Sequence, residues 1–485
     1  MTKTSSTPLL LLLATSLFIG CGSQTDVLTE PGPSAYLGTI PDTEQSYCFD
    51  ELTAIDCQAE GAGFFGQDAQ YLGETLAYQD HGDGTVTDEI TGLMWTQTFT
   101  QTSWDEAFVV AAELTTGGYD DWRVPTIKEL YSLMSFAGNT GTGTQDELAV
   151  PADAVPFVDT DTFDFEYGQV NRFIDAQYVS STQYVGTTMG GDETFFGLNF
   201  ADGRIKGYPI QRPGGLSYYA YFVRGGGDYG QNAFADNGDE TITDAGTGLM
   251  WMQHDNGHYG QGDATYGGFI WADALAYCEA LDLADHDDWR LPNAKELQSL
   301  VDYTRSPTTT DSPAIDPLLG ATAITVEDGS ENYPFYWSAT THAEGNGVKA
   351  AYVAFGQAFG FMTDPNGGTT FMDVHGAGCQ RSDPKVGDPA DYPTGFGPQG
   401  DVIRIYNFVR CVRGGATITT ETSAASTWQG GTGDPPGPAT CTVDGDCLAD
   451  GACPPDATMG CTCEDIGAES ICVPACSIDA DCPTG

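Results

Sequence analysis

One segment of fourteen residues occurs twice in this chain: DDWRVPTIKELYSL begins at Asp120 and DDWRLPNAKELQSL begins at Asp287. Four more blocks repeat around it in the same order: GDGTVTDEITGLMW with GDETITDAGTGLMW, YVSST with YWSAT, FGLNFADG with AYVAFGQA, and FVRGGG with CVRGGA. Ordered repetition of this kind indicates a duplicated folding unit. The chain, at 485 residues too long for one ordinary core, is therefore expected to contain two copies of one module.

Each copy shows the same order of elements. The β-branched segments TVTD and TITD follow a turn and predict a hairpin. Apolar residues then recur at i, i+3, i+4, i+7 and i+10, which predicts an amphipathic helix. They are Trp104, Ala107, Phe108, Ala111 and Leu114 in copy one, and Trp271, Ala274, Leu275, Cys278 and Leu281 in copy two. After a second helix the period falls to two, so each module is expected to be α+β, two helices followed by an antiparallel strand meander.

The twice-occurring segment predicts the start of that second helix. Thr126 precedes Glu129, and Asn293 precedes Glu296, at the spacing of a capping box. A catalytic role for Lys128 with Glu129 is disfavoured, because neighbouring helix positions point in different directions and the glutamate already has a capping role. We interpret the motif as scaffold.

The two ends of the chain predict export and a modular layout. Residues 1–20 have the layout of a secretory signal, and LFIGC, ending at Cys21, resembles a bacterial lipobox with Phe18 in place of the usual leucine. Lipidation at Cys21 is expected, with plain secretion as the alternative. The expected division is 1–20 signal peptide, 21–70 N-terminal linker region, 71–227 first module, 231–416 second module, 417–440 Thr/Ser/Gly/Pro linker, and 441–485 disulfide-rich tail.

Of the 14 cysteines, two in copy two predict a disulfide from the repeat itself. Cys278 and Cys411 correspond to Ala111 and Phe222 in copy one, so both cysteines are missing together there. A pair that is gained or lost together is expected to be bonded. Because the exported compartment is oxidising, we expect a disulfide that ties the first helix of copy two to its closing strand.

The other cysteines are less well determined. Cys48 and Cys57 lie close together before the first module, and eight more crowd between Cys441 and Cys482. Disulfides are expected for both groups, since a zinc ribbon would need two clean CxxC pairs that the tail lacks. The number left after Cys21 is odd, and Cys379 is the candidate unpaired thiol.

The formal net charge of −52 restricts the partners. Nucleic acids, polyanions and anionic lipid surfaces require a positive footprint that this composition lacks. The acidity is interpreted as solubility, with bound calcium as the alternative. The aspartates around each hairpin (Asp80, Asp83, Asp88; Asp236, Asp239, Asp244) lack EF-hand spacing and indicate turns.

The motifs TDxxTGLMW, DDWRLPxxKEL, YWSAT and FVRCVRGG together resemble the Lcl C-terminal domain family, found at the C-terminus of the Legionella collagen-like adhesin. The resemblance covers residues 71–227 and 231–416 and implies an extracellular recognition module. That adhesin's association with sulfated polysaccharides rests on a basic surface, which this chain lacks. RLP and VRGG are also similar to the formylglycine-generating enzymes, which implies a C-type-lectin-like architecture.

The predicted function is non-catalytic recognition by an exported, adhesin-like protein that is held to the cell envelope by its lipid anchor alone. Duplicated modules raise the effective concentration for a repeated ligand, such as a glycan or a surface protein. An enzyme of the formylglycine-generating kind would need a reactive cysteine pair, and copy one has none; GxSxG, HExxH and GxxxxGK are absent from the sequence. Zinc at His254 and His258 is disfavoured, and a purely structural envelope protein is the other alternative. The oligomeric state is left open.

Two insertions in copy two indicate where a ligand would bind, because binding residues are often carried by loops on a shared frame. The first holds Asp255, Asn256, His258, Tyr259, Asp263 and Tyr266; the second holds Asp373, His375, Asp383, Asp388 and Tyr392. Aromatic faces beside carboxylates suit a sugar, with or without calcium, although plain solvated loops would give the same pattern. Deletion of residues 255–268 is expected to abolish binding and to leave the melting temperature nearly unchanged.

Overall fold

The computed structural model describes Met1, residues 38–143, Gln145, and residues 147–211, 217–363 and 368–430, and the backbone of 461–465 and 470–474. The predicted signal peptide, the lipidation site at Cys21 and most of the cysteine-rich tail lie outside the described residues. Within the described part, no helix has the length and apolar character that a membrane crossing requires.

Each copy begins with a four-stranded antiparallel sheet built from its hairpin and its closing strand. In copy one the order is β12-β6-β5-β4, with β4 Tyr78–Asp80, β5 Thr85–Asp88, β6 Met94–Thr96 and β12 Val223–Arg224. In copy two it is β13-β14-β15-β23, with β13 Phe234–Asp236, β14 Thr241–Asp244, β15 Leu249–Met252 and β23 Val412–Arg413. The predicted hairpins are confirmed, and Trp95 and Trp251 are fully buried beneath them.

The expected helices form in both copies. They are α1 Trp104–Glu113 and α2 Ile127–Ser132 in copy one, and α3 Trp271–Glu279, α4 Ala294–Ser299 and the short α5 Pro307–Thr310 in copy two. Both predicted capping boxes are present at α2 and α4. The prediction for Phe108 is wrong: its side chain is 39% exposed and packs edge-on against Trp104, because Ala107 and Ala111 make the close contact with the core.

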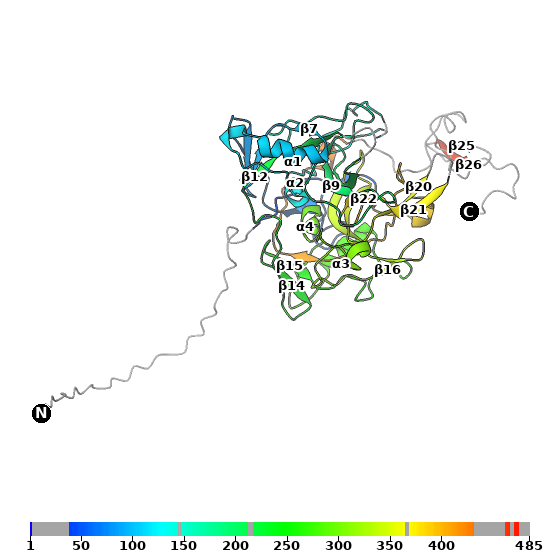
Figure 1. Ribbon diagram of the computed structural model, residues 1–485. Helices are drawn as coiled ribbons and strands as arrows, with labels where there is room; N and C mark the ends of the chain where they lie inside the picture. Colours follow the sequence, from blue (N-terminus) through cyan, green and yellow to red (C-terminus); the bar gives the residue numbers. More distant parts are fainter. Residues whose placement is uncertain are drawn as a thin grey trace. The chain divides into compact units, whose positions relative to one another are not determined.

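The meander strands of the two copies form one eight-stranded sheet, in the order β18-β19-β22-β10-β9-β8-β11-β7. Copy one supplies β7 Thr100–Thr102, β8 Gln177–Tyr178, β9 Thr194–Asn199, β10 Arg204–Pro209 and β11 Tyr218–Ala220. Copy two supplies β18 Phe335–His342, β19 Lys349–Ala354 and β22 Gln380–Pro384. The copies join where Ile205 of β10 pairs with Gln380 of β22, and Figure 1 shows β9 and β22 close together at this junction.

Separate meanders were expected, one for each copy, and the shared sheet differs from that expectation. On the copy-one side of the junction, β10 is followed by β9 and then β8. On the copy-two side, β22 is followed by β19 and then β18, so β22 and β10 occupy equivalent positions in the two copies. The extra residues of copy two include a hairpin between β19 and β22, formed by β20 Phe359–Thr363 and β21 Thr369–Asp373. Further two-residue strands, β16 Ile324–Thr325 and β17 Glu331–Asn332, pair with each other.

The lysine of the segment Lys-Glu-Leu, in both copies, donates a hydrogen bond to the other copy. Lys128 Nζ of α2 donates to the carbonyl of Ser299 at the end of α4 (2.7 Å), and Lys295 Nζ of α4 donates to the carbonyl of Ser132 at the end of α2 (2.9 Å). Each lysine therefore satisfies a helix C-terminal carbonyl that has no partner within its own helix. Burial lowers the pKa of each lysine to about 8. The exchange fixes α2 against α4 on one face of the shared sheet.

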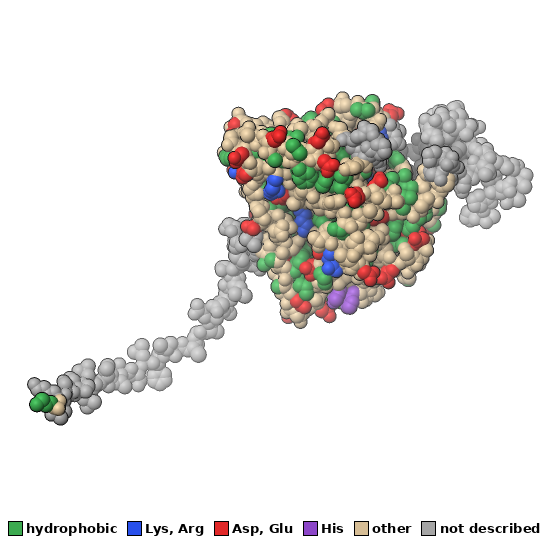
Figure 2. Space-filling view, viewed as in Figure 1, with side chains coloured by type: hydrophobic (Ala, Val, Ile, Leu, Met, Phe, Trp, Pro, Cys, Tyr) green, Lys and Arg blue, Asp and Glu red, His purple; other side chains and the backbone are tan. Residues whose placement is uncertain are grey.

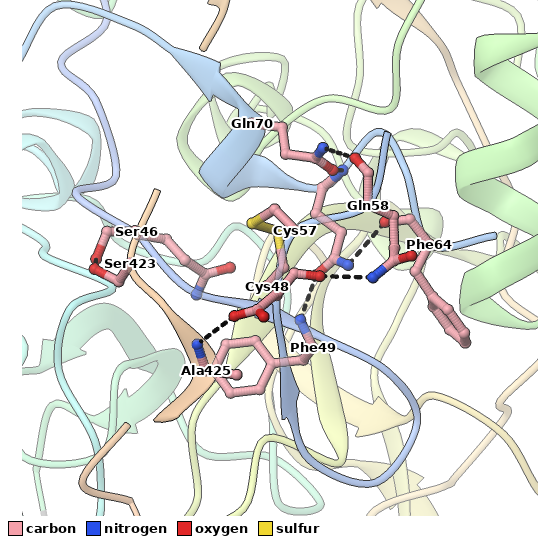
Figure 3. Close-up of a disulfide and its surroundings, with 12 residues drawn as sticks. Ser46, Cys48, Phe49, Cys57, Gln58, Phe64, Gln70, Ser423 and Ala425 are labelled. Carbon is pink, nitrogen blue, oxygen red and sulfur yellow. Dashed lines mark hydrogen bonds between the residues drawn. A yellow bond between two sulfur atoms is a disulfide. The ribbon is translucent and has the colours of Figure 1, made fainter. Parts of the chain in front are cut away.

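Residues 38–70 and 417–430 are packed parts of the fold, which corrects the assignment of 21–70 to an N-terminal linker region and of 417–440 to a linker. The strands β1 Cys48–Phe49, β2 Ala54–Ile55, β3 Tyr71–Leu72 and β24 Thr417–Ile418 form two small sheets, and β24 pairs with β3. Figure 3 shows the returning segment beside the Cys48–Cys57 disulfide, where Ala425 N donates to Asp56 at 2.9 Å. Trp428 packs edge-on against Phe49, with ring centroids 5.1 Å apart.

Two predicted disulfides are confirmed, Cys278–Cys411 and Cys48–Cys57. Cys379 is the free cysteine among the described residues, and it is buried. In the tail, the backbone of β25 Cys461–Asp465 and β26 Ser470–Pro474 forms an antiparallel hairpin.

Candidate ligand-binding groove

The duplicated motif is scaffold in both copies. Trp289 Nε1 donates to the carbonyl of Leu283 (3.2 Å), and Arg290 forms two hydrogen bonds with the capping-box glutamate Glu296 (2.7 and 2.5 Å). Asp288 binds Arg413 of the VRGG block at 2.7 Å. Copy one repeats these contacts with Trp122, Arg123, Glu129, Asp121 and Arg224. The polar groups of the motif are thus used to hold its helix to the closing strand.

A groove with a volume of about 1290 Å³ lies over the shared sheet and is lined by both copies. Its floor is formed by strands from β7 to β19 in sheet order, with Gln101, Gln177, Asn199, Arg204, Lys206, Tyr208, Tyr219, Tyr352 and Arg381 among the lining residues. Alternate residues of a strand point to opposite faces. Ile205, between Arg204 and Lys206, is buried in the core beneath the helices, so the groove occupies the sheet face away from α2 and α4.

The groove concentrates the few basic side chains of this acidic chain. Five of its 17 lysines and arginines line the groove: Arg172, Arg204, Lys206, Lys349 and Arg381. Four of the 69 acidic residues accompany them: Asp175, Asp202, Glu344 and Asp401. On the face drawn in Figure 2, by contrast, acidic side chains are spread widely and few basic ones are visible. The groove lining therefore has one more basic than acidic side chain, on a molecule of net charge −52.

Ion pairs across the copies hold these groups in place. Arg204 of copy one binds Glu344 of copy two and donates to Ser382 Oγ at 3.0 Å. Lys206 Nζ lies 3.0 Å from Asp202, and Lys349 Nζ lies 2.6 Å from Glu344. Burial, followed by the neighbouring arginines, lowers the pKa of Lys349 to about 7. Burial likewise lowers the pKa of Lys206 to about 8.

Arg381 and Asp401 form a second cluster with a histidine. Arg381 Nη2 binds Asp401, and Asp401 Oδ1 also accepts a hydrogen bond from His375 Nε2 at 2.9 Å. Burial lowers the pKa of His375 to about 4, so its ring is neutral near pH 7. The pKa of Asp401 is well below its usual range: Arg381 and His375 outweigh its burial.

The rim of the groove adds an exposed aromatic ring. Phe396 is 54% exposed, and Lys349 Nζ lies 4.7 Å from the centre of its ring. Neutral hydrogen-bonding groups surround the opening, among them Thr142, Gln145, Gln169, Asn171, Asn346 and Gln399. An aromatic face beside amide and hydroxyl groups is suited to a ligand with both apolar and hydroxyl-bearing faces.

The family model of the Lcl C-terminal domain matches the chain twice, over residues 84–224 and 240–372, which together are more than half of its length. This chain belongs to the Lcl C-terminal domain family. Membership suggests a surface, adhesin-like protein. No curated protein and no solved structure matches the chain.

The first insertion of the second Lcl C-terminal domain contains two predicted ligand-binding residues that are inside the fold. Asp255 and Asn256 are fully buried. Asp255 accepts from Thr322 and from Tyr336 Oη (2.5 Å), and Asn256 Oδ1 accepts from the backbone of Val409 (2.8 Å). These bonds hold the insertion to the domain. The expectation that deleting residues 255–268 would leave the melting temperature nearly unchanged is therefore corrected.

The other predicted residues of this insertion lie at the surface. His258 stacks on His254 (ring centroids 3.9 Å), and Tyr259 Oη is 3.2 Å from Glu240. Asp263 accepts from backbone N–H groups of its own turn, as at Tyr266 N (3.0 Å). Tyr266 is 42% exposed and stacks on Tyr406. His258, Asp263 and Tyr266 are exposed, while Tyr259 is partly buried against the core, and none of the four lines the groove.

The second insertion reaches the junction of the two domains. Asp373 is 5% exposed and accepts from Tyr184 Oη of copy one (2.9 Å); His375, beside it, supports Asp401 under the groove. Asp383 is buried and accepts from the backbone of Arg404 (3.1 Å). Asp388 caps a short turn, and Tyr392 is partly buried after it. Burial raises the pKa of Asp373 to about 6.

The hairpin aspartates serve the turns, as predicted. Asp88 and Asp244 are fully buried and accept from backbone N–H groups that follow them, while Asp83 and Asp239 accept from the next threonine. Throughout the described ranges, no group of three or more His, Cys, Asp or Glu is placed to hold a metal ion.

Sequence reasoning missed the groove residues Arg204, Lys206, Lys349 and Arg381. A signal was present, because RIKGY places Arg204, Lys206 and Tyr208 on one face of a strand, and polar side chains on one strand face indicate solvent or a ligand. In a chain with 17 basic residues, two on one strand face stand out. The partners in copy two could not be recognised without knowing that β22 lies next to β10.

Proposed function

We propose that this chain is an adhesin-like surface protein that binds a glycan, or a comparable extracellular ligand, in the groove between its two Lcl C-terminal domains. The observation that carries the proposal is the single sheet that runs through both copies and forms the groove floor. A site built from both copies gives the duplication a function beyond avidity. Export, lipidation at Cys21 and a place in the cell envelope are part of this proposal, with secretion as the alternative.

Two features of the cysteines support binding without catalysis. Cys278 and Cys411 are joined as a disulfide, so neither offers a thiol. Cys379 is buried, and burial raises the pKa of its thiol well above its usual range, which disfavours the reactive thiolate. The thiol chemistry of formylglycine-generating enzymes therefore has no support in these residues. We keep their C-type-lectin-like architecture as a proposal for each module, and a structural envelope role as the alternative function.

Two exposed aromatic residues distinguish the groove from the copy-two insertion. Phe396 (54% exposed) is on the groove rim, and Tyr266 (42% exposed) is on the insertion. On a glycan array, Phe396→Ala is expected to weaken binding by the full chain about tenfold or more, because aromatic anchors dominate binding energy. Tyr266→Ala is the matched control and is expected to bind as the unchanged chain does.

The array is run with and without calcium, which tests calcium as a candidate cofactor. Binding lost in Tyr266→Ala and retained in Phe396→Ala would place the site on the insertion. Absence of any bound glycan in both calcium conditions would favour the structural envelope protein.

A further inference from the structure

The charges of the groove do not cancel. Apart from the rim pair of Arg172 with Asp175, four cations line it: Arg204, Lys206, Lys349 and Arg381. Three carboxylates face them: Asp202, Glu344 and Asp401. His342 and His375 are buried with lowered pKa values and add no charge near pH 7. The lining thus holds one positive charge without a matching carboxylate when all four cations are protonated.

Hydrogen-bond donors are also in excess. Arg204 Nε and Arg381 Nε and Nη1 are buried and have no hydrogen-bond partner among the described residues. Two carboxylate oxygens of the groove, Asp202 Oδ1 and Glu344 Oε1, also have none, so three donors stand against two acceptors. A buried donor without a partner costs free energy, so the cluster favours an added acceptor. A carboxylate on the ligand supplies two acceptor oxygens and one negative charge. It therefore meets both needs of the groove, for hydrogen-bond acceptors and for one negative charge.

The rest of the molecule limits how much negative charge a ligand can carry. With a formal charge of −52, the surface repels a polyanion over its whole length, whereas the repulsion on a single carboxylate is small and screened by salt. The exposed ring of Phe396 and the amides of the rim suit the neutral remainder of a sugar.

We propose that the groove binds a monocarboxylated saccharide; this inference rests on the groove being the ligand site. The carboxylate of the saccharide lies at the cluster of Arg204, Lys206, Lys349 and Arg381, and one face of its ring lies on Phe396. Sulfated or polycarboxylated chains are excluded by the surface charge. The carboxylate of the ligand completes the ion-pair network that the two domains build together.

Proton uptake gives this ligand class a distinctive pH dependence. Lys349 pairs with Glu344, and the charges of Arg204, Arg381, Asp383 and Asp401 also act on it. Its pKa of about 7 leaves it mainly neutral at pH 9. An anion beside Lys349 favours the protonated amine, so binding takes up a proton above pH 7. Lys206, with a pKa of about 8, loses its proton over the same range. Affinity is expected to fall as pH rises from 6 to 9, by at most about tenfold per pH unit for each proton taken up.

The test compares methyl glucuronoside with methyl glucoside, which differ in the carboxylate, by calorimetric titration of the full chain at pH 6 and pH 9. The glucuronoside is expected to bind about tenfold or more tightly at pH 6, the value of a charge-assisted hydrogen bond, and to lose most of this preference at pH 9. Lys206→Met and Lys349→Met should remove the preference, while Arg224→Met, on β12 outside the groove, should keep it.

Equal affinity for the two sugars would overturn the charge inference and leave the groove as a neutral-glycan site. A higher affinity for dextran sulfate than for the glucuronoside would also overturn it. The pH comparison uses the unchanged chain, so the inference can fail even where a lysine variant does not fold. Failure of the proposed function itself is distinguishable, because Phe396→Ala would then leave array binding unchanged.

Discussion

Replacing Cys278 and Cys411 by alanine should lower the free energy of unfolding by about 5 kcal/mol in the chain-entropy account of disulfides. The bond joins α3 to the segment that leads into β23 across 133 residues of sequence, so its loss frees a very long loop in the unfolded chain. Alanine is the residue that copy one carries at the first of these positions, Ala111, where it is buried without strain on the helix.

The Cys48–Cys57 disulfide is the matched control, because it closes a loop of only 9 residues' separation. The same double substitution there is expected to cost about 3 kcal/mol. Denaturant unfolding of both variants beside the unchanged chain measures the two losses. A larger loss for the Cys48–Cys57 variant would contradict the loop-length account and the role of Cys278–Cys411 as the main brace of copy two.

Arg290→Met should cost about 3 to 5 kcal/mol of stability, because it leaves a buried carboxylate unpaired. The side chains of Arg290 and Glu296 are 3% and 5% exposed, and Arg290 also donates to the carbonyl of Gly414 at 2.8 Å. Methionine fills a similar volume, so the loss reports the charge and its hydrogen bonds rather than a cavity.

Copy one supplies the control for this substitution. Arg123 makes the same two contacts with Glu129, whose side chain is 4% exposed, but the arginine itself is 39% exposed. Removal of this exposed arginine therefore opens a path for water to the carboxylate. Arg123→Met is expected to cost about 1 kcal/mol, as partly exposed ion pairs do. Equal losses of stability for the two variants in thermal or denaturant unfolding would contradict this account. They would show that burial of the ion pair does not determine how much it stabilises the fold.

Local pattern and internal comparison were enough to predict much of each module. The helices that begin at Trp104 and Trp271, and the capping boxes at Thr126 and Asn293, are determined by residues within one or two helical turns of each other. The disulfide of Cys278 could be predicted because the first copy, which lacks both cysteines, served as a reference. Each of these features can be recognised either from residues close together in the sequence or from the comparison of the two copies.

The pairing of β10 with β22, which connects the two copies, could not be predicted from the sequence. No local pattern specifies which strand of one copy pairs with which strand of the other. Arg204 and Ser382 are bonded across 178 positions of sequence, and their strands carry no pairing signal. Likewise, the burial of Asp255 cannot be recognised from its insertion alone, because its partners, Thr322 and Tyr336, lie 67 and 81 positions away. Burial of an acidic residue is decided by such distant donors.

The segments before and after the modules were misread for a related reason. The Thr, Ser, Gly and Pro content of the segment after the second module is typical of a spacer. Yet Gln45 exchanges hydrogen bonds with Thr341 of β18, and Trp428 covers Phe49. A few anchoring contacts are enough to order a segment whose composition alone indicates a linker.

The central claim is that the ligand contacts both Lcl C-terminal domains at the groove over their shared sheet. Hydrogen–deuterium exchange of the full chain, with and without the glycan identified on the array, tests this most directly. The account predicts that the ligand slows exchange in two rim segments, 169–175 of copy one and 396–401 of copy two, which are far apart in sequence and line the same groove. Slower exchange confined to residues 255–268 would contradict it and place the site on the insertion of copy two.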